Sequence, residues 1–200
     1  KAKTKNYFWC SNITSEVFNN NCFNFKNVSI NSKNINPQTL FIAIKGKKKD
    51  GHNYVNEALL NGAVKAVVHK SINGINPKKL IRVSNTLAAL NNLAIKTREN
   101  SRAKIIGITG SSGKTTLKNM LSFVLKNFGN TCFSQRSFNN HYGVPLSLSN
   151  LKENDAYGVF ELGMNKKGEI NSLSRMLKPD VAVITNISQA HLENFKNLKE

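Results

Sequence analysis

The sequence predicts an α/β protein with a small N-terminal α/β domain followed by a larger P-loop domain on a doubly wound, mostly parallel sheet. From about residue 103, short apolar runs alternate with helical stretches, a pattern typical of βαβ units. A glycine-rich turn also connects the first of these runs to an amphipathic helix. We expect the small domain over residues 1–84 and the larger domain over residues 85–200, where it is incomplete at its C-terminal end.

The larger domain is expected to begin with a strand at residues 104–109. The helix after the glycine-rich turn carries one apolar stripe at helical spacing, made of Leu117, Met120, Leu121, Val124, Leu125 and Phe128. Gly129 is expected to end this helix as its C′ residue. Further strands are predicted at residues 131–134, 156–162 and 181–186, with a helix at residues 169–177 that Pro179 closes.

The small domain shows weaker signals of the same kind. Apolar runs predict short strands at residues 40–44, 66–69 and 80–83, and a helix near residues 54–61. A helix over residues 85–100, opened by the capping residue Asn85, is expected to join the two domains.

The composition excludes several classes of protein. The formal net charge is +18, but the lysines are spread through every segment without an arginine-rich arm, and a coding bias explains them better than a nucleic-acid surface. Cys10, Cys22 and Cys132 are far apart and odd in number, so neither a disulfide framework nor a zinc site is expected. No apolar run reaches the roughly 18 residues that span a bilayer. We expect a cytoplasmic monomer with no nucleic-acid or membrane partner.

The glycine-rich turn is the strongest chemical signal. The residues Gly110, Ser111, Ser112, Gly113, Lys114, Thr115 and Thr116 lie between a predicted strand and a helix. Backbone N–H groups in this position cradle the phosphates of ATP, a lysine reaches the β and γ phosphates, and a threonine hydroxyl binds Mg²⁺. The spacing G-x-x-G-K-T-T is shorter than the common P-loop, yet the order strand, loop, lysine and helix favours a nucleotide site over a chance turn.

Polar residues beyond the P-loop are candidates for the rest of the site. Glu161 ends a predicted strand, where a carboxylate can bind Mg²⁺, although it can also be a solvated strand end. His191 follows another strand by a short turn, and the spacing alone leaves a metal or phosphate ligand and an ordinary histidine equally open. Asn139 and Asn140 lie in a polar loop that either binds substrate or turns the chain.

Together these motifs resemble the Mur ligase family. The resemblance runs from about residue 29 to the end of the chain, and its most specific segments are residues 109–116, 139–145, 161–170 and 185–193. The small domain is similar to the segment of that family that binds a UDP-sugar, through Asn31, Ser32, Lys33, Asp50 and His52. The family usually has Asp-Ser-Arg at residues 31–33 and glycine at Gln38, and a lysine in place of the arginine loses bidentate phosphate recognition.

The resemblance implies an ATP-dependent amide ligase of peptidoglycan synthesis. ATP would phosphorylate the terminal carboxylate of UDP-N-acetylmuramoyl-tripeptide, and the amine of D-alanyl-D-alanine would then attack the acyl phosphate. Lys114 would stabilise the transferred phosphoryl group, Thr115 and Glu161 would hold one Mg²⁺, and His191 would help to hold a second.

In the family a carbamylated lysine and a third domain complete the site, and both are expected beyond Glu200. We therefore expect residues 1–200 to bind nucleotide weakly and not to ligate. The sequence leaves open a sister ligase of the same architecture, while the small domain argues against a folyl-polyglutamate synthetase. A P-loop switch or nucleic-acid-associated ATPase is the alternative of another class.

Overall fold

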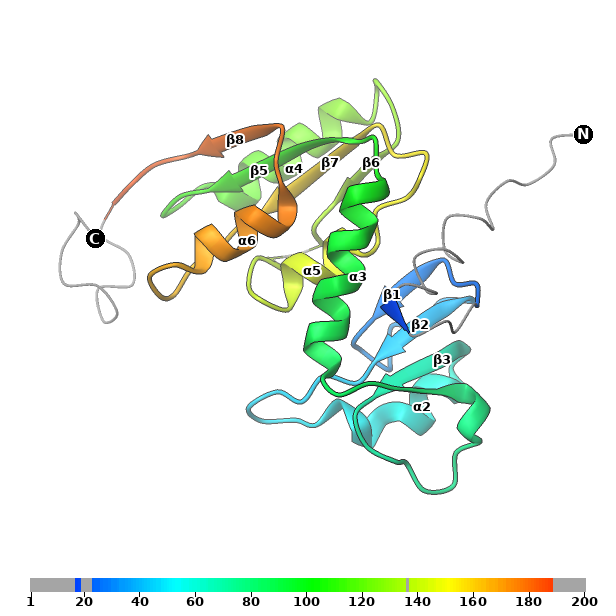
Figure 1. The fold of residues 1–200 in the computed structure, drawn as a ribbon. Helices are drawn as coiled ribbons and strands as arrows, with labels where there is room; N and C mark the ends of the chain where they lie inside the picture. Colours follow the sequence, from blue (N-terminus) through cyan, green and yellow to red (C-terminus); the bar gives the residue numbers. More distant parts are fainter. Residues whose placement is uncertain (1–16, 19–22, 136, 189–200) are drawn as a thin grey trace, which may run out of the picture. The chain divides into compact units, whose positions relative to one another are not determined.

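The structure is a computed structural model that describes residues 17–18, 23–135 and 137–188. The chain divides into two units, Lys1–Lys96 and Thr97–Glu200, and helix α3, Thr86–Asn100, runs across the division (Figure 1). The boundary that the sequence predicts, between residues 84 and 85, lies immediately before this helix. Asn85 caps it as expected, because its Oδ1 accepts hydrogen bonds from the N–H groups of Leu87 and Ala88 at 2.9 and 3.0 Å.

The first unit is built on a parallel sheet of four strands in the order β1-β2-β3-β4. These strands are β1, Asn27–Ser29; β2, Thr39–Ile42; β3, Ala63–Val68; and β4, Leu80–Arg82. Helix α2, Val55–Leu60, packs on β3, and the short 3₁₀ turns η1, Gly51–Tyr54, and η2, Pro77–Lys79, complete the unit. The three strands and the helix predicted here are confirmed, whereas β1 has too short an apolar signal to be predicted.

Gln38 precedes β2 with a positive φ of 63°, in the left-handed region that a side chain disfavours. Its carbonyl oxygen accepts hydrogen bonds from the N–H groups of Lys26, at 2.7 Å, and Asn27, at 3.3 Å. The turn into β2 therefore requires this backbone conformation. This explains why a glycine suits the position better than the glutamine found here.

The second unit confirms the predicted α/β sheet, with four parallel strands in the order β6-β7-β5-β8. The strands are β5, Lys104–Thr109; β6, Thr131–Phe133; β7, Tyr157–Glu161; and β8, Val181–Ile184. The helices are α4, Lys114–Leu125; α5, Gly143–Leu148; and α6, Glu169–Leu177. In Figure 1, α4 lies on one face of the sheet, and α5 and α6 lie on the other.

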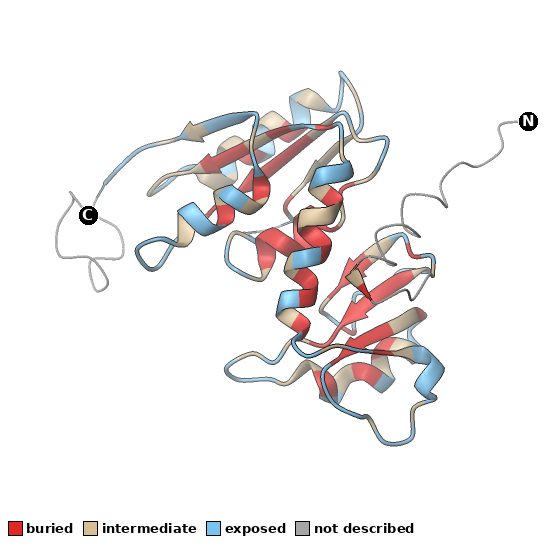
Figure 2. Cartoon of the chain, in the orientation of Figure 1, coloured by how far each residue is buried: buried red, intermediate tan, exposed pale blue. Residues whose placement is uncertain are grey.

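The two inner strands of this sheet are its most buried part. Four consecutive residues of β7, Gly158–Glu161, are buried, so both faces of the strand are covered (Figure 2). β8 lies at an edge, and Val181 and Ile184 on it are 53% and 61% exposed. The core thus surrounds the carboxyl ends of β5 and β7, which fixes the backbone from which the candidate site is built.

The apolar stripe predicted on α4 is not its buried face. Met120 and Val124 are 62% and 50% exposed, and Phe128, 71% exposed, lies beyond the last helical residue. The side of α4 that is buried instead carries Lys118 and Ser122. The amphipathic pattern therefore predicted the helix correctly, but of its stripe only Leu117, Leu121 and Leu125 are half-buried, and the fully buried positions are polar.

Two boundaries also differ from the sequence prediction. α4 ends at Leu125, and Gly129 lies beyond a turn in which the N–H of Phe128 donates to the carbonyl of Leu125. Gly129 has no positive φ, and a Cβ there would lie 2.7 Å from that of Ala156, so close packing explains this glycine. The polar loop predicted around Asn139 and Asn140, at residues 137–145, contains the start of α5, because Gly143 begins that helix.

The end of α6 is closed by a network that also ties α3 to the start of β5. Lys178 takes a left-handed φ of 44° after α6, and Pro179 follows it, as predicted. Arg98 donates to the carbonyls of Leu177 and Lys178 at 2.9 and 2.8 Å and forms an ion pair with Asp180 at 3.3 Å. The hydrogen bond from the N–H of Ile105 is the main reason that the pKa of Asp180 is lowered.

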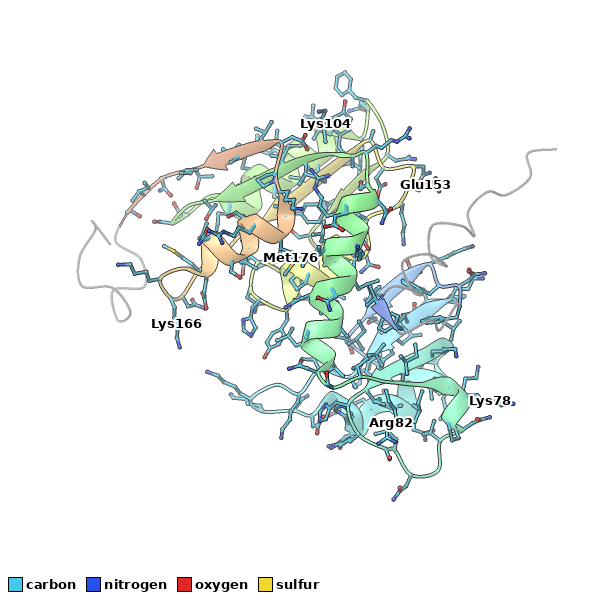
Figure 3. All side chains as sticks on the ribbon, viewed as in Figure 1. Lys78, Arg82, Lys104, Glu153, Lys166 and Met176 are labelled. Atoms are coloured by element: carbon cyan, nitrogen blue, oxygen red, sulfur yellow. The ribbon has the colours of Figure 1, made fainter. Side chains whose placement is uncertain are left out.

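Basic side chains are distributed over both units. Lys78 and Arg82 are exposed on the first unit, and Lys104 and Lys166 are exposed on the second (Figure 3). Within the described ranges, the structure contains no helix with both the length and the apolar character needed to cross a bilayer.

Candidate nucleotide site

The P-loop connects the end of β5 to the start of α4, as the sequence predicts. Ile108 of β5 pairs with Glu161 of β7 across the parallel sheet, so the P-loop and this carboxylate lie at the same sheet edge. Gly110 and Gly113 have φ angles of 134° and 77°, which only glycine adopts readily. A Cβ on Gly110 would also collide with the hydroxyl of Thr185. Both glycines are therefore required by the shape of the loop.

The helix α4 offers unpaired N–H groups at its start. Among the described residues, the N–H groups of Gly113, Lys114, Thr115 and Thr116 have no hydrogen-bond partner, and the first bond of the helix is from Leu117 to the carbonyl of Gly113. Such donors, aided by the helix dipole, bind phosphate groups. The Lys114 ammonium donates to the carbonyl of Gly110 at 2.5 Å, so it stays beside the loop.

Glu161 is 1% exposed, and its carboxylate is held by two side chains from different elements. Thr115 donates its hydroxyl to Oε2 at 2.7 Å, and Asn139 donates its amide to Oε1 at 2.7 Å. The N–H of Glu161 additionally donates to Ser134 Oγ at 3.3 Å. The solvated strand-end interpretation of Glu161 therefore does not fit, because the carboxylate is buried and directed at the P-loop.

Lys118 is a buried cation in the same region that the sequence did not identify. It is 1% exposed and lies one helical turn beyond Lys114 on α4. Burial lowers its pKa, and the negative charge of Glu161 acts in the opposite direction. Lys118 therefore partly offsets the charge of Glu161 within the core.

The donor set fits a magnesium ion. Glu161 and Thr115 provide a carboxylate and a hydroxyl oxygen, which are the hard ligands that Mg²⁺ prefers, and they already lie within 2.7 Å of each other. No group of three or more histidine, cysteine or acidic side chains that could hold a metal occurs among the described residues. His191, the third predicted metal ligand, lies outside the described residues, so its role stays a prediction.

The two predicted asparagines have different surroundings. Asn139 contacts Glu161, and its carbonyl oxygen accepts the N–H of Gly163 at 2.8 Å. A Cβ on Gly163 would lie 2.7 Å from the Asn139 side chain, so that glycine makes room for it. Asn140 Oδ1 accepts hydrogen bonds from the N–H groups of Tyr142 and Gly143 at the start of α5. The structure thus gives Asn140 the role of a helix cap, and its predicted substrate contact stays a prediction.

In the first unit, Asn31, Ser32 and Lys33 form a turn directly after β1. Asn31 Oδ1 accepts the N–H of Lys33 at 3.1 Å, whereas Ser32 is buried and donates its hydroxyl to Glu57 at 2.9 Å. Asn61 anchors the same turn by donating to the carbonyl of Ser32 at 2.8 Å. Of the three predicted residues, Lys33 presents an exposed cation, while the Ser32 hydroxyl is already engaged within the protein.

Asp50 and His52 form a second cluster in this unit. His52 is 2% exposed, its Nδ1 lies 2.6 Å from Asp50 Oδ1, and its Nε2 accepts the N–H of His69 at 3.1 Å. The acceptor role of Nε2 assigns the proton of a neutral ring to Nδ1. Both ring nitrogens of His52 are therefore bonded within the protein. A substrate contact at this cluster would have to be made by other atoms than these two nitrogens.

The charge of Asp50 is stabilised by its neighbours. Burial raises its pKa, but hydrogen bonds from the N–H of His52 and from the Lys70 ammonium, at 2.9 Å each, outweigh it and hold the pKa well below its usual range. Among the described residues, no hydrogen bond joins this cluster to the turn at residues 31–33. The structure therefore builds two separate polar groups rather than one.

Two further residues contact the P-loop, and although they lie in the segment 185–193 that carries the resemblance, no role was predicted for them from the sequence. Thr185 Oγ1 donates to the carbonyl of Ser112 at 2.6 Å, and Asn186 Oδ1 accepts the N–H of Ser112 at 2.9 Å. Both follow β8 at its carboxyl end. This position, beside the strand that leads into the P-loop, was the signal that could have identified them.

Family models match almost the whole described chain in two parts. Residues 24–106 match the model described as the Mur ligase family, catalytic domain, and residues 108–200 match the Mur ligase middle domain. Among curated proteins, the UDP-N-acetylmuramoyl-tripeptide--D-alanyl-D-alanine ligase of Rickettsia prowazekii is 42% identical over 180 residues, which is 90% of this chain. The ligase of the same name from Buchnera aphidicola subsp. Baizongia pistaciae is 38% identical over 195 residues.

Solved structures agree with these matches. MurF from Acinetobacter baumannii superposes with a TM-score of 0.79 at 32% identity and covers 96% of this chain. MurF from Thermotoga maritima, solved in complex with ADP, gives a TM-score of 0.72 at 34% identity over 87% of this chain. The chain spans 40% and 42% of the length of the two curated relatives, and 44% and 40% of these structures. On these matches and the shared fold, the chain belongs to the Mur ligase family.

Proposed function

We propose that this chain forms the substrate-binding and ATP-binding parts of a ligase that joins D-alanyl-D-alanine to UDP-N-acetylmuramoyl-tripeptide. The observation that carries the proposal is the contact between Thr115 of the P-loop and the buried carboxylate of Glu161, at 2.7 Å. The curated relatives that bear this activity in their names, 42% and 38% identical, support it. We also propose that the protein is a cytoplasmic monomer. We propose that it binds no nucleic acid, since its basic residues are spread over both units.

The proposed chemistry activates a carboxylate with ATP. A carboxylate oxygen of the tripeptide attacks the γ-phosphorus, ADP leaves, and an acyl phosphate forms. The amine of the dipeptide then attacks the acyl carbon, and the tetrahedral intermediate expels phosphate as the amine loses a proton. The amide bond therefore forms at the expense of one phosphoanhydride bond, with one oxygen of the original carboxylate leaving in the phosphate.

The residues of this chain would bind and orient the nucleotide. The N–H groups from Gly113 to Thr116 point from the start of a helix, where anions are stabilised. Lys114 would turn from the carbonyl of Gly110 to the transferred phosphoryl group, because its flexible side chain can exchange one acceptor for a charged one. These fixed donors would stabilise the negative charge that is spread over the oxygens of the phosphoryl group in the transition state.

Glu161 and Thr115 are the groups that would hold Mg²⁺, and His191 is proposed to contribute to a second ion. When bound, Mg²⁺ would offset the charge of the β and γ phosphates. Asn139 would keep the Glu161 carboxylate in place through its 2.7 Å hydrogen bond. In the first unit, we propose that Lys33 and the Asp50 cluster contribute to the UDP-sugar site, with Asn31, Ser32 and His52 shaping it.

Phosphate release by the full-length protein tests this proposal. We expect release from Mg²⁺ and ATP only when both UDP-N-acetylmuramoyl-tripeptide and D-alanyl-D-alanine are present, and no release in the Lys114→Met variant. A rate of phosphate release that does not depend on the two substrates, or that DNA or RNA increases, would contradict a ligase. It would favour a P-loop switch or a nucleic-acid-associated ATPase. Replacing D-alanyl-D-alanine by single amino acids tests the sister-ligase alternative in the same assay.

We also propose that residues 1–200 alone bind nucleotide weakly and do not complete the ligation. The support is that this chain spans about two fifths of the length of its curated relatives. Amide product formed by this chain alone would overturn that statement.

A further inference from the structure

The segment Thr185–Ser188 is hydrogen-bonded to the P-loop along its length. The N–H of Ser111 donates to the carbonyl of Asn186 at 3.0 Å. Ser111 Oγ donates to the carbonyl of Ser188 at 3.0 Å and lies 2.9 Å from the N–H of Ser188. This segment, which we name the strap, therefore holds the first half of the P-loop from outside the loop.

Asn186 makes the most specific contacts of the strap. Its Oδ1 accepts the N–H of Ser112 at 2.9 Å, and its Nδ2 donates to Ser112 Oγ at 2.8 Å. The two ends of one carboxamide thus engage both the backbone and the side chain of one loop residue. Such a bidentate contact fixes the orientation of the Ser112 N–H and of its side chain as well as their position.

Thr185 binds the third polar group of Ser112, its backbone carbonyl. Its Oγ1 lies 2.6 Å from the carbonyl of Ser112 and 3.2 Å from the carbonyl of Thr109. The N–H of Thr185 also donates to Thr109 at 2.9 Å. Gly110 has no side chain to block this approach, since a Cβ there would collide with the Thr185 hydroxyl. The strap thus depends on the glycine that begins the loop.

The contacts divide the P-loop donors into two sets. The N–H groups of Ser111 and Ser112 are taken by the strap, whereas those from Gly113 to Thr116 have no partner among the described residues. The carbonyl of Ser112, which Thr185 holds, lies in the same peptide group as the N–H of Gly113. Asn186 fixes the preceding peptide group, so the strap sets the start of this second set. We infer that Thr185 and Asn186 are positioning residues that hold the P-loop in the shape that presents Gly113 to Thr116 to the nucleotide phosphates.

The inference rests on the proposed nucleotide site but not on the identity of the two substrates to be joined. It makes a quantitative claim about phosphate binding. Preorganised donors bind anions more tightly than donors that must first be ordered. Loss of the two hydrogen bonds made by the Asn186 side chain should therefore weaken nucleotide binding about tenfold.

The test compares ADP binding, with Mg²⁺ present, in the full-length wild-type protein and two strap variants. Asn186→Ala removes both side-chain bonds to Ser112, while Ser188→Ala is a matched control, because Ser188 contacts Ser111 through backbone atoms only. We expect calorimetric titration to give an ADP affinity about tenfold lower for Asn186→Ala and unchanged for Ser188→Ala. Far-UV circular dichroism should show that all three proteins are folded at the temperature of the titration.

A second pair of variants keeps the test decisive if Asn186→Ala folds poorly. Thr185→Val removes the hydroxyl with little change of shape, and Thr185→Ser retains it. We expect Thr185→Val to bind ADP several-fold more weakly and Thr185→Ser to restore the wild-type affinity, a rescue that a purely structural role would not require. Equal ADP affinities in wild type, Asn186→Ala and Thr185→Val would overturn the inference. A wild-type protein that does not bind ADP at all would instead overturn the proposed nucleotide function on which it rests.

Discussion

Replacement of Glu161 by glutamine perturbs the candidate site at its centre while preserving the shape of the side chain. The carboxylate accepts hydrogen bonds from Thr115 and Asn139 at 2.7 Å each, but an amide offers one oxygen in place of two. Losing one hydrogen bond to a charged group costs about 2 kcal/mol, and Lys118 also loses a nearby negative charge. We expect Glu161→Gln to lower the melting temperature by about 5 °C.

The same variant should separate Mg²⁺ binding from nucleotide binding. In thermal melts, Mg²⁺ with ADP should stabilise the wild-type protein more than ADP alone, because a ligand that binds only the folded state raises its stability. Glu161→Gln should show the same shift with and without Mg²⁺. Glu153→Gln is the matched control, since Glu153 is an exposed acid away from the P-loop (Figure 3). If Glu161→Gln melts like Glu153→Gln and keeps the Mg²⁺ effect, the metal-binding role of Glu161 is wrong.

Three further predictions concern the framework. Gln38→Gly should raise the free energy of unfolding by about 0.5–1 kcal/mol, because it relieves the strain of the positive φ of 63°, although glycine makes the unfolded chain more flexible. Urea denaturation measures this, with Gln38→Ala as the control. A glycine variant less stable than wild type would contradict it. Asp180→Asn should destabilise the protein by about 1 kcal/mol at pH 7. The pKa of Asp180 is lowered in the folded protein, so its contribution is present above about pH 4 and is lost as the pH falls through the folded value. A stability difference between wild type and Asp180→Asn that does not shrink as the pH is lowered below about 4 would contradict this assignment. The surroundings of the half-buried Cys132 raise the pKa of its thiol to about 12. In a Cys10→Ser, Cys22→Ser background, a thiol reagent at pH 8 should therefore label the folded protein far more slowly than the unfolded one, and equal rates would refute the raised pKa.

The elements with local signals at both ends could be predicted from the sequence. The strand at Lys104–Thr109 and the helix at Glu169–Leu177 have the predicted bounds, because a glycine-rich loop ends the first and Pro179 follows the second. The strand Asn27–Ser29 could not be predicted, since three residues carry too little periodicity and its pairing with β2 is a tertiary contact. Local residues thus set the bounds of these elements, whereas a short strand such as β1 forms only because it pairs with a neighbouring strand.

The buried face of α4 shows the limit of periodicity. Apolar spacing identifies an amphipathic helix, but it does not reveal that Lys118 and Ser122 face the interior while Met120 is exposed. Burial lowers the pKa of Lys118, and the charge of Glu161, on a strand 43 residues later in the sequence, acts in the opposite direction. A charge pair of this kind is invisible to any local pattern.

Sequence motifs located the site better than they assigned roles within it. Thr115, Glu161 and Asn139 were predicted as separate candidates, and the structure joins them by hydrogen bonds. His52 was predicted to bind substrate, yet its ring is held by Asp50 and by the backbone of His69, 17 residues further on. Only the folded chain brings that N–H to the imidazole, so the internal role could not be read from the motif.

Isotope transfer from the carboxylate tests the central claim, that this site activates a carboxylate with ATP, most directly. The full-length protein would be supplied with UDP-N-acetylmuramoyl-tripeptide carrying ¹⁸O in both oxygens of its terminal carboxylate, together with ATP, Mg²⁺ and D-alanyl-D-alanine. Mass spectrometry of the released phosphate should then find one ¹⁸O atom for each amide bond formed, because the acyl phosphate passes one carboxylate oxygen to the phosphate. Phosphate without ¹⁸O would show that water, not the carboxylate, attacks ATP and would contradict the account.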